Sequence, residues 1–382
     1  MSIGYWISIA VWAMLVAAAL RPPMRPVPLA RAAFLLSVAA NEIPLVLLVV
    51  FAIPMVRALA IDDSGAPGRW LGAGAACAVT AGFLLVYVRT VRDRAIVARE
   101  VGLPAGARRA SWSALLPLPL RPRGVERRRD LPYSPDGGRA HRLDVYRHRS
   151  TPPGAPVLVY FHGGGFSGGD KHFESRHLWY RMAQAGWVVV SANYALRPTT
   201  GFPGHLIDAK RAIAWVREHA AELGAGGDTL AVAGSSAGGH IAAMCALTGN
   251  RPEFQPGFEG ADTRVSGAIG LYGYYGRYYG GARGEEPSSL PADYPASAAP
   301  PVLVVHGGHD SFISVRSARD LVRDLRAGSP SAVTYVEFPA ANHGFDVFAG
   351  PRYRAVVDGA EEFLSRVAST PTATAARRKD LR

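Results

Sequence analysis

The chain opens with three long apolar segments. Residues 3–20 carry no charge, residues 32–56 include Asn41 and Glu42, and residues 70–88 are again uncharged. A helix rises about 1.5 Å per residue, so segments of this length come close to crossing the roughly 30 Å of hydrocarbon in a bilayer. We therefore predict about three transmembrane helices at the start of the chain.

Two of these segments have alternative interpretations. The first has the length of a signal peptide, but it lacks a positively charged start and further apolar segments follow it. The alternative for the second is a buried or re-entrant hairpin, because Glu42 must face a partner helix or water rather than lipid.

Beyond residue 125, short apolar runs alternate with amphipathic stretches. The runs predict strands over 139–147, 156–161, 187–193, 229–233, 265–271, 301–306 and 333–338. The stretches between them predict helices over 173–185, 203–223, 237–247, 315–327 and 352–367. This alternation implies an α/β fold in which helices cover both faces of a mostly parallel sheet.

Arginines and prolines mark the join between the two parts. Between Arg89 and Arg129, eleven arginines face three acidic residues, within a chain whose formal net charge is +12. We therefore divide the chain into a membrane region (1–90), an Arg/Pro-rich linker (91–124), a globular domain (125–370) and a disordered basic tail (371–382).

The arginine cluster also bears on partners and orientation. It directly follows an apolar segment and carries no zinc motif or interleaved aromatics, which favours anionic lipid headgroups over nucleic acid. A short amphipathic stretch over 112–120 has the pattern of a segment lying on the membrane surface. Arginines after the first and third apolar segments predict, by the positive-inside rule, an integral protein of a bacterial plasma membrane with its globular domain in the cytoplasm. The sequence does not predict an oligomeric state.

The main chemical signal is the sequence GSSAGG at 234–239. It follows an apolar run and precedes a predicted helix, the context in which a G-x-S-x-G motif places a serine on a sharp strand-to-helix turn. Gly234 and Gly238 allow that turn without Cβ clashes, and the helix directs its N-terminal dipole toward Ser236. Taken alone, the same pattern equally suits a glycine-rich turn without chemistry.

An HGGG motif after the second predicted strand supplies further chemistry. Acyl transfer builds negative charge on a carbonyl oxygen, which needs fixed N–H donors in a dry site. We expect the N–H groups of Gly164, Gly165 and Ala237 to form this oxyanion hole. Gly163 lets the backbone approach closely, and His162 is expected to hold the loop rather than to act as a base. The alternative, a phosphate-binding turn, lacks the Lys-Ser/Thr that completes a P-loop.

A serine hydroxyl is a poor nucleophile near neutral pH and needs a base that a carboxylate orients. Asp310 follows the predicted strand that ends at 306, and His343 follows the last predicted strand. Both are therefore expected at the carboxyl edge of the sheet, where α/β proteins bind ligands. His306, His309 and Asp346 are weaker candidates by position. The chemistry requires no cofactor or metal, and the sequence has neither H-E-x-x-H nor a cysteine pair with ligand spacing.

These motifs in this order resemble the hormone-sensitive-lipase-like family of carboxylesterases. The resemblance covers roughly residues 143–367 and includes HGF at 343–345 and LRP at 196–198. It implies an α/β-hydrolase fold and hydrolysis of short- to medium-chain acyl esters without a cofactor. Ser235 stands where many members have Asp, and the family's N-terminal cap helices are not recognisable. The Tyr-rich segment over 272–279, which continues through 287–300, is expected to form the acyl pocket or a lid, or else an ordinary surface loop.

We therefore predict a membrane-anchored serine esterase or lipase that acts on small-molecule or lipid esters. Ser236 is the predicted nucleophile of an acyl-enzyme mechanism, His343 its base and Asp310 the third member of the triad. A deacetylase or amidase that uses the same residues is one alternative, and a degenerate hydrolase domain used for binding is another. The membrane region is expected to provide retention rather than chemistry, because every residue with a predicted chemical role lies beyond residue 125.

Overall fold

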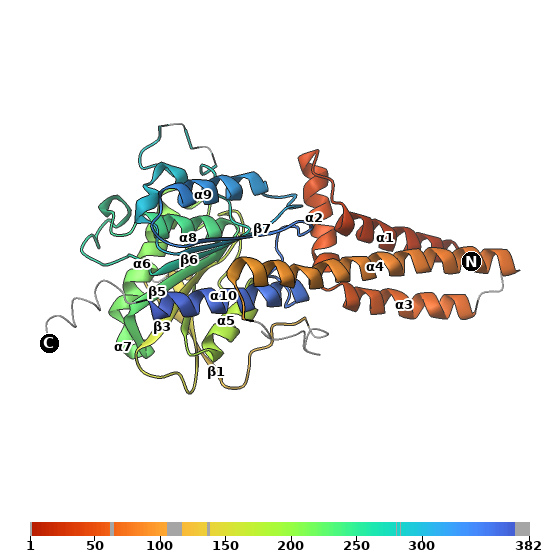
Figure 1. Cartoon of the computed structure of the whole chain (residues 1–382), viewed down its shortest axis with the longest axis horizontal. Helices are drawn as coiled ribbons and strands as arrows, with labels where there is room; N and C mark the ends of the chain where they lie inside the picture. Colours follow the sequence, from red (N-terminus) through yellow and green to blue (C-terminus); the bar gives the residue numbers. More distant parts are fainter. Residues whose placement is uncertain are drawn as a thin grey trace.

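The structure is a computed structural model of the chain. It describes residues 2–61, 65–104, 117–135, 138–279, 281–282 and 284–370. A globular domain carries a narrow bundle of helices that projects from one side (Figure 1). Most of the amphipathic stretch predicted over 112–120 and all of the tail predicted over 371–382 lie outside the described residues.

The globular domain is built on one sheet of eight strands, in the order β1-β2-β4-β3-β5-β6-β7-β8. All neighbouring pairs from β4 to β8 are parallel, whereas β1 and β2 are antiparallel additions at one edge. The mostly parallel sheet predicted from the alternating pattern is confirmed. The strands are β1 (Val125–Pro132), β2 (Arg142–His148), β3 (Ala155–Phe161), β4 (Val188–Ala192), β5 (Ala225–Ser235), β6 (Gly267–Leu271), β7 (Val302–Gly307) and β8 (Val333–Phe338).

Helices cover both faces of this sheet, as the side chains of its central strand require. Val157, Val159 and Phe161 of β3 lie in one core with α6, α8 and α9, whereas Leu158 and Tyr160 lie in the opposite core with α5 and α10. This period of two follows from strand geometry, so both faces of the strand must be apolar. The helices are α5 (Arg176–Gln184), α6 (Gly204–Glu218), α7 (Ala220–Leu223), α8 (Ala237–Leu247), α9 (Val315–Gly328) and α10 (Pro351–Ser369).

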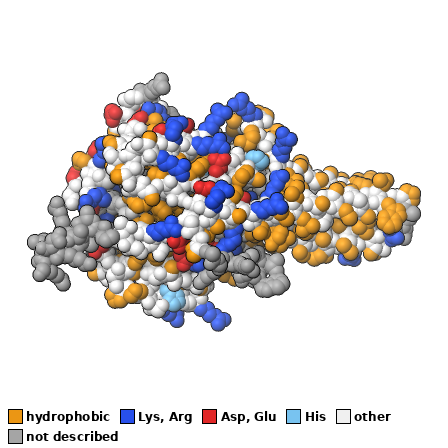
Figure 2. Space-filling view, viewed as in Figure 1, with side chains coloured by type: hydrophobic (Ala, Val, Ile, Leu, Met, Phe, Trp, Pro, Cys, Tyr) orange, Lys and Arg blue, Asp and Glu red, His pale blue; other side chains and the backbone are white. Residues whose placement is uncertain are grey.

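The projecting bundle consists of α1 (Ile3–Leu20), α3 (Pro44–Ala60) and α4 (Gly65–Val101). Its interior is aromatic and aliphatic: the Trp12 ring packs edge-on against Phe51 and Phe83, with centroids 5.7 and 5.9 Å away. Its outer surface is also apolar, whereas charged side chains lie over the globular domain (Figure 2). Among the described residues, two helices, or three when the bent pair described next counts as one span, are long and apolar enough to cross a membrane.

The second apolar segment is not one straight helix. It forms α2 (Val27–Glu42) and α3, which meet at a bend of 92°. Pro44 explains the break, because a residue that precedes proline is disfavoured in the α region, and Ile43 has φ −131° and ψ 45°. As a result α2 lies across the base of the bundle, between the bundle and the globular domain (Figure 1).

The helix α4 continues past the predicted boundary at residue 90 and ends at Val101. Val97 and Val101 lie in the core that α5 and α10 form, and Arg94 makes a 2.6 Å ion pair with Asp358 of α10. The first part of the predicted linker is therefore a helix that packs on the globular domain. One continuous helix joins the bundle to that domain.

A buried ion cluster holds three separate parts of the chain together. The Arg352 guanidinium of α10 donates from Nε to Asp93 of α4 at 2.6 Å and from Nη1 to Glu42 at the end of α2. Arg352 and Glu42 are each 1% exposed and Asp93 is 4% exposed. Glu42 thus has the partner that its place in an apolar segment requires.

Replacing Arg352 with Met should destabilise the full-length protein by about 3–5 kcal/mol, because two buried carboxylates lose their counter-ion. The loss should appear as a lower apparent Tm in detergent micelles. The triple variant Glu42→Gln, Asp93→Asn, Arg352→Met removes all three charges together and should recover most of the loss. A triple variant no more stable than Arg352→Met would contradict this account of the cluster.

Candidate active site

Ser236 occupies a strained turn between β5 and α8, with φ 55° and ψ −113°. The neighbouring glycines are required by close backbone approach. A Cβ on Gly234 would lie 2.1 Å from the Gly238 carbonyl oxygen, and one on Gly238 would lie 2.0 Å from that of Phe161. This crowding fixes the backbone, so the Ser236 side chain is presented at the carboxyl edge of the sheet.

Ser236, His343 and Asp310 form one hydrogen-bonded chain at that edge. His343 Nε2 lies 3.0 Å from Ser236 Oγ, and His343 Nδ1 lies 2.7 Å from Asp310 Oδ2. The other carboxylate oxygen, Asp310 Oδ1, accepts the backbone N–H groups of Phe312 and Ile313 at 2.9 and 2.7 Å. Each member is thus held by the next, and the carboxylate is held by the main chain.

The electrostatics of Asp310 set the tautomer of His343. Burial opposes ionisation of Asp310, but the adjacent His343 and His306 outweigh it and hold the pKa of Asp310 well below its usual range. Asp310 is therefore an anion near neutral pH and favours the proton on His343 Nδ1, which leaves Nε2 free to accept from Ser236. His306 Nε2 lies 3.3 Å from Asp310 Oδ2, so this second histidine supports the carboxylate.

His162 supports the loop that follows β3. Its ring is buried and stacks on Tyr194 with centroids 4.5 Å apart, and its Nδ1 lies 2.6 Å from the Gly163 carbonyl oxygen. Burial lowers the pKa of His162 to about 4, so the ring is neutral near pH 7. The Gly163 N–H is itself taken by Glu174 Oε2 at 2.7 Å.

Three backbone donors remain beside Ser236. Among the described residues, no acceptor is paired with the N–H groups of Gly164, Gly165 and Ala237. Gly164 and Gly165 line the same cavity as Ser236, and Ala237 is the first residue of α8. Unpaired donors at the start of a helix and on a glycine loop are suited to bind negative charge.

The cavity at Ser236 has a volume of about 670 Å³, within the usual range for small-molecule sites. One of its walls comes from α2, where the Phe34 ring lies 5.7 Å from the His343 ring. The membrane region was expected to provide retention rather than chemistry; the bend at Ile43 turns α2 onto the globular domain, so this region also supplies part of the pocket wall. The lining residues are Arg31, Phe34, Leu35, Val38, Gly164, Gly165, Ser167, Phe173, Glu174, Arg197, Ser236, Tyr279, Phe312, His343, Gly344 and Val347.

A buried polar network behind the triad was not foreseen from the sequence. Asp346 accepts hydrogen bonds from Ser175 Oγ at 2.5 Å, from Ser235 Oγ at 2.6 Å and from the Tyr272 hydroxyl. Burial raises the pKa of Asp346, and these three donors oppose that rise. The Tyr272 ring lies 4.5 Å from the ring of His343. Asp346, weighed as an alternative acid, thus holds Ser235 and the Tyr272 ring that packs on His343.

The Tyr-rich segment contributes to the pocket, since Tyr279 lines it and the Tyr272 ring packs against the ring of His343.

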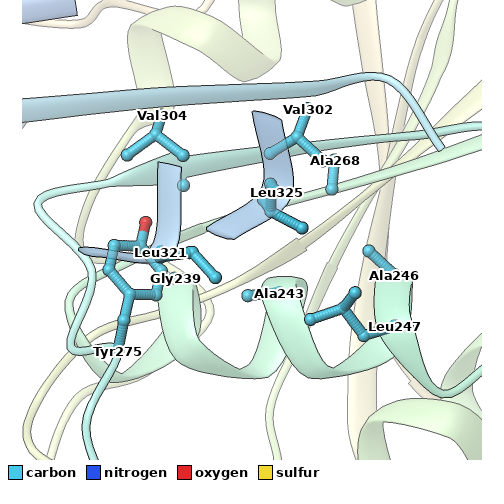
Figure 3. A pocket seen from close by; sticks show the side chains of 11 residues that line it. Gly239, Ala243, Ala246, Leu247, Ala268, Tyr275, Val302, Val304, Leu321 and Leu325 are labelled. Carbon is cyan, nitrogen blue, oxygen red and sulfur yellow. The ribbon is translucent and has the colours of Figure 1, made fainter. Parts of the chain in front are cut away.

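A separate cavity of about 10 Å³ lies between α8, β6, β7 and α9 and is lined mainly by aliphatic side chains (Figure 3). A gap of this size has room for about one water molecule and suits no substrate.

One set of side chains has the composition of a metal site. Asp130, Asp144 and His172 bring their ligand atoms within 4.8 Å of one another. However, Asp144 is already paired with Lys171 at 2.9 Å and with Arg127 at 2.5 Å. The cluster is thus a charge network with its own cations, and it fits a metal poorly.

Comparisons with known proteins agree with this geometry. Residues 143–275 match the BD-FAE family. The chain is 38% identical over 284 residues to esterase LipQ of Mycobacterium tuberculosis, covering 67% of each protein. It is 36% identical over 299 residues to the probable carboxylic ester hydrolase LipM of the same organism, covering 70% of this chain and 67% of LipM. The chain belongs to the hormone-sensitive-lipase-like esterases of the α/β-hydrolase fold.

This membership confirms the resemblance drawn from the motifs and makes the protein an ester hydrolase. A solved structure of Thermogutta terrifontis esterase 2 phosphonylated by cyclosarin is similar in fold and sequence. It has a TM-score of 0.55 and 26% identity, and the match covers 64% of this chain and 95% of that one.

The glycine loop of this esterase allows a matched pair of substitutions. A Cβ on Gly164 (φ 111°) would lie 2.2 Å from the Gly168 carbonyl oxygen, whereas one on Gly165 (φ 61°) would meet only Ser167 Oγ at 4.0 Å. Gly164→Ala should therefore displace the loop and lower kcat for p-nitrophenyl butyrate by about 10²–10³-fold, the usual cost of a lost oxyanion donor. Gly165→Ala should keep most of the activity. Equal losses in the two variants would contradict a role for this loop geometry.

Proposed function

We propose that this protein is a membrane-anchored serine esterase or lipase that hydrolyses short- to medium-chain acyl esters through an acyl-enzyme. The observation that carries the proposal is the hydrogen-bonded chain of Ser236, His343 and Asp310, two of which, Ser236 and His343, line an accessible cavity. The phosphonylation of Thermogutta terrifontis esterase 2 by cyclosarin supports a nucleophile of the same kind here.

In the first half of the reaction, Ser236 Oγ attacks the ester carbonyl carbon while its proton passes to His343 Nε2. Asp310 stabilises the imidazolium that forms, because its Oδ2 accepts a hydrogen bond from Nδ1–H, with 2.7 Å between Nδ1 and Oδ2. The carbonyl oxygen becomes an oxyanion, and the unpaired N–H groups of Gly164, Gly165 and Ala237 are the donors for it. The C–O bond to the leaving group then breaks, and the alcohol departs with the proton from His343.

In the second half, water replaces the alcohol. His343 Nε2 takes a proton from the water as its oxygen attacks the acyl carbon of the Ser236 ester. The second tetrahedral intermediate uses the same three N–H donors. It collapses when Ser236 Oγ leaves and recovers the proton from His343. The carboxylic acid is released and the triad returns to its starting state.

We also propose that α1, α3 and α4 cross a membrane and that the globular domain lies on its cytoplasmic side. The apolar outer surface of the bundle supports this, as do helices of 17 and 18 residues, which extend about 26 Å. Arginines lie at the end of the bundle nearest the domain, after α1 and in the second half of α4, as the positive-inside rule requires. With α2 lying across the base of the bundle, three crossings still remain.

A fluorophosphonate probe tests both parts of the proposal in membranes washed with alkaline carbonate. Label should appear on the full-length chain and on the Ser235→Ala variant in the washed membranes. The Ser236→Ala variant should lose the label, and its p-nitrophenyl butyrate turnover should fall on the order of 10⁶-fold. Labelled Ser236→Ala protein would contradict the assigned nucleophile. Labelled protein released into the carbonate supernatant would contradict the membrane anchor.

A further inference from the structure

The mouth of the catalytic pocket is apolar. Among the described residues beyond Arg121, three large hydrophobic side chains are more than about a third exposed. These are Phe173 (58%), Tyr279 (42%) and Phe312 (39%), and all three line the pocket. From α2, Leu35 joins them and is 71% exposed. Exposed hydrophobic side chains gathered at one opening indicate a surface that contacts lipid or another apolar partner.

The helix α2 connects this rim to the membrane bundle. It is bent by 92° from α3, so it lies nearly parallel to a membrane that α3 crosses. Large hydrophobic side chains of α2 outside the pocket, namely Val27, Leu29 and Leu36, are also exposed. The apolar surface of the bundle thus continues through α2 to the rim of the pocket, which favours the bilayer as the partner.

Two arginines lie at the mouth of this pocket. Arg31 of α2 and Arg197 of the globular domain are exposed and line the pocket, and the Arg31 guanidinium lies 5.3 Å from the Phe312 ring centroid. Across the described ranges of the chain, neither guanidinium forms an ion pair with a carboxylate. Burial raises the pKa of Tyr279, and both arginines oppose the rise, so both lie near its phenol.

The carboxyl group of Glu174 in the pocket wall does not neutralise these arginines. Burial raises the pKa of Glu174 to about 8, and the charge of Asp346 adds to the rise. Near pH 7 this carboxyl is mainly uncharged, and one of its oxygens already accepts the Gly163 N–H. The mouth of the pocket is therefore apolar and positively charged at once.

We propose that the substrate is a membrane lipid ester with a phosphate-bearing headgroup. Its acyl chain lies against Phe34 and Leu35 of α2, its ester carbonyl reaches Ser236, and its phosphate binds Arg31 and Arg197. Guanidinium groups suit phosphate because their planar N–H donors match its oxygens in pairs. This assignment rests on the proposed function, and it adds the substrate class and two residues that select it.

The test uses the full-length protein in vesicles of diether phosphatidylcholine, which has no acyl ester to hydrolyse. The vesicles carry a minor fraction of either dioctanoyl phosphatidate or dioctanoylglycerol, and released octanoate is measured. The wild type should prefer the phosphatidate. Arg31→Gln and Arg197→Gln should each lower the phosphatidate-to-diacylglycerol ratio of kcat/KM by about tenfold. A wild type with no preference, or variants with an unchanged ratio, would overturn the proposal.

Arg25→Gln is the matched control, since Arg25 is exposed in the loop before α2 and does not line the pocket. It removes the same charge and should leave the ratio unchanged. An equal fall in Arg25→Gln would mean that general surface charge, and not the pocket, selects the lipid.

Two further substrates distinguish a failure of the bilayer or headgroup assignment from a failure of the proposed function. Dibutyryl phosphatidate stays in solution, and it should be hydrolysed less efficiently than the phosphatidate in vesicles. Equal kcat/KM values would place the substrate in solution and overturn the bilayer part of the proposal. Hydrolysis of p-nitrophenyl butyrate reports Ser236 chemistry independently. If this activity persists without a lipid preference, the headgroup assignment fails; if it is absent from the wild type, the proposed function fails.

Discussion

The buried guanidinium of Arg352 is the interaction on which the arrangement of this esterase depends. It pairs with Glu42 at the end of α2 and with Asp93 in α4, so one side chain of the globular domain holds two helices of the membrane region. A buried charge is stable only with its partners, so the three segments are coupled. Because α2 is fixed in this way, Phe34 can pack on His343 and close one side of the pocket.

Close backbone packing at the edge of the sheet fixes the turn that carries Ser236. The start of α8 approaches β5 at Gly234 and β3 at Gly238 so closely that only glycines fit there, and Ser236 between them has a positive φ. Behind it, Asp346 ties Ser235 to Tyr272, whose ring supports His343. The side chains at the reacting centre are thus held by main chain and buried hydrogen bonds, the preorganisation that acyl transfer requires.

Local pattern was enough to predict part of this molecule. The strand–turn–helix context of Ser236 and the strand-end positions of Asp310 and His343 depend on neighbours in sequence, and the structure brings these three side chains into one hydrogen-bonded chain. The edge strand β1 was missed because its charged residues face solvent and need no apolar alternation. The pairing of Glu42 with Arg352, 310 positions apart, leaves no local signal. The role of α2 as a pocket wall depends on that pairing and on the break before Pro44.

A helix of the membrane region forms part of the pocket at Ser236. The most direct test is a fluorophosphonate whose alkyl chain carries a photoreactive group at its end. After the probe reacts with Ser236 in native membranes, illumination and peptide mapping show which residues lie near the end of its carbon chain. The account predicts cross-links in the α2 peptide that contains Phe34, Leu35 and Val38, all of which line the cavity. Cross-links confined to the globular domain, with none on α2, would contradict it.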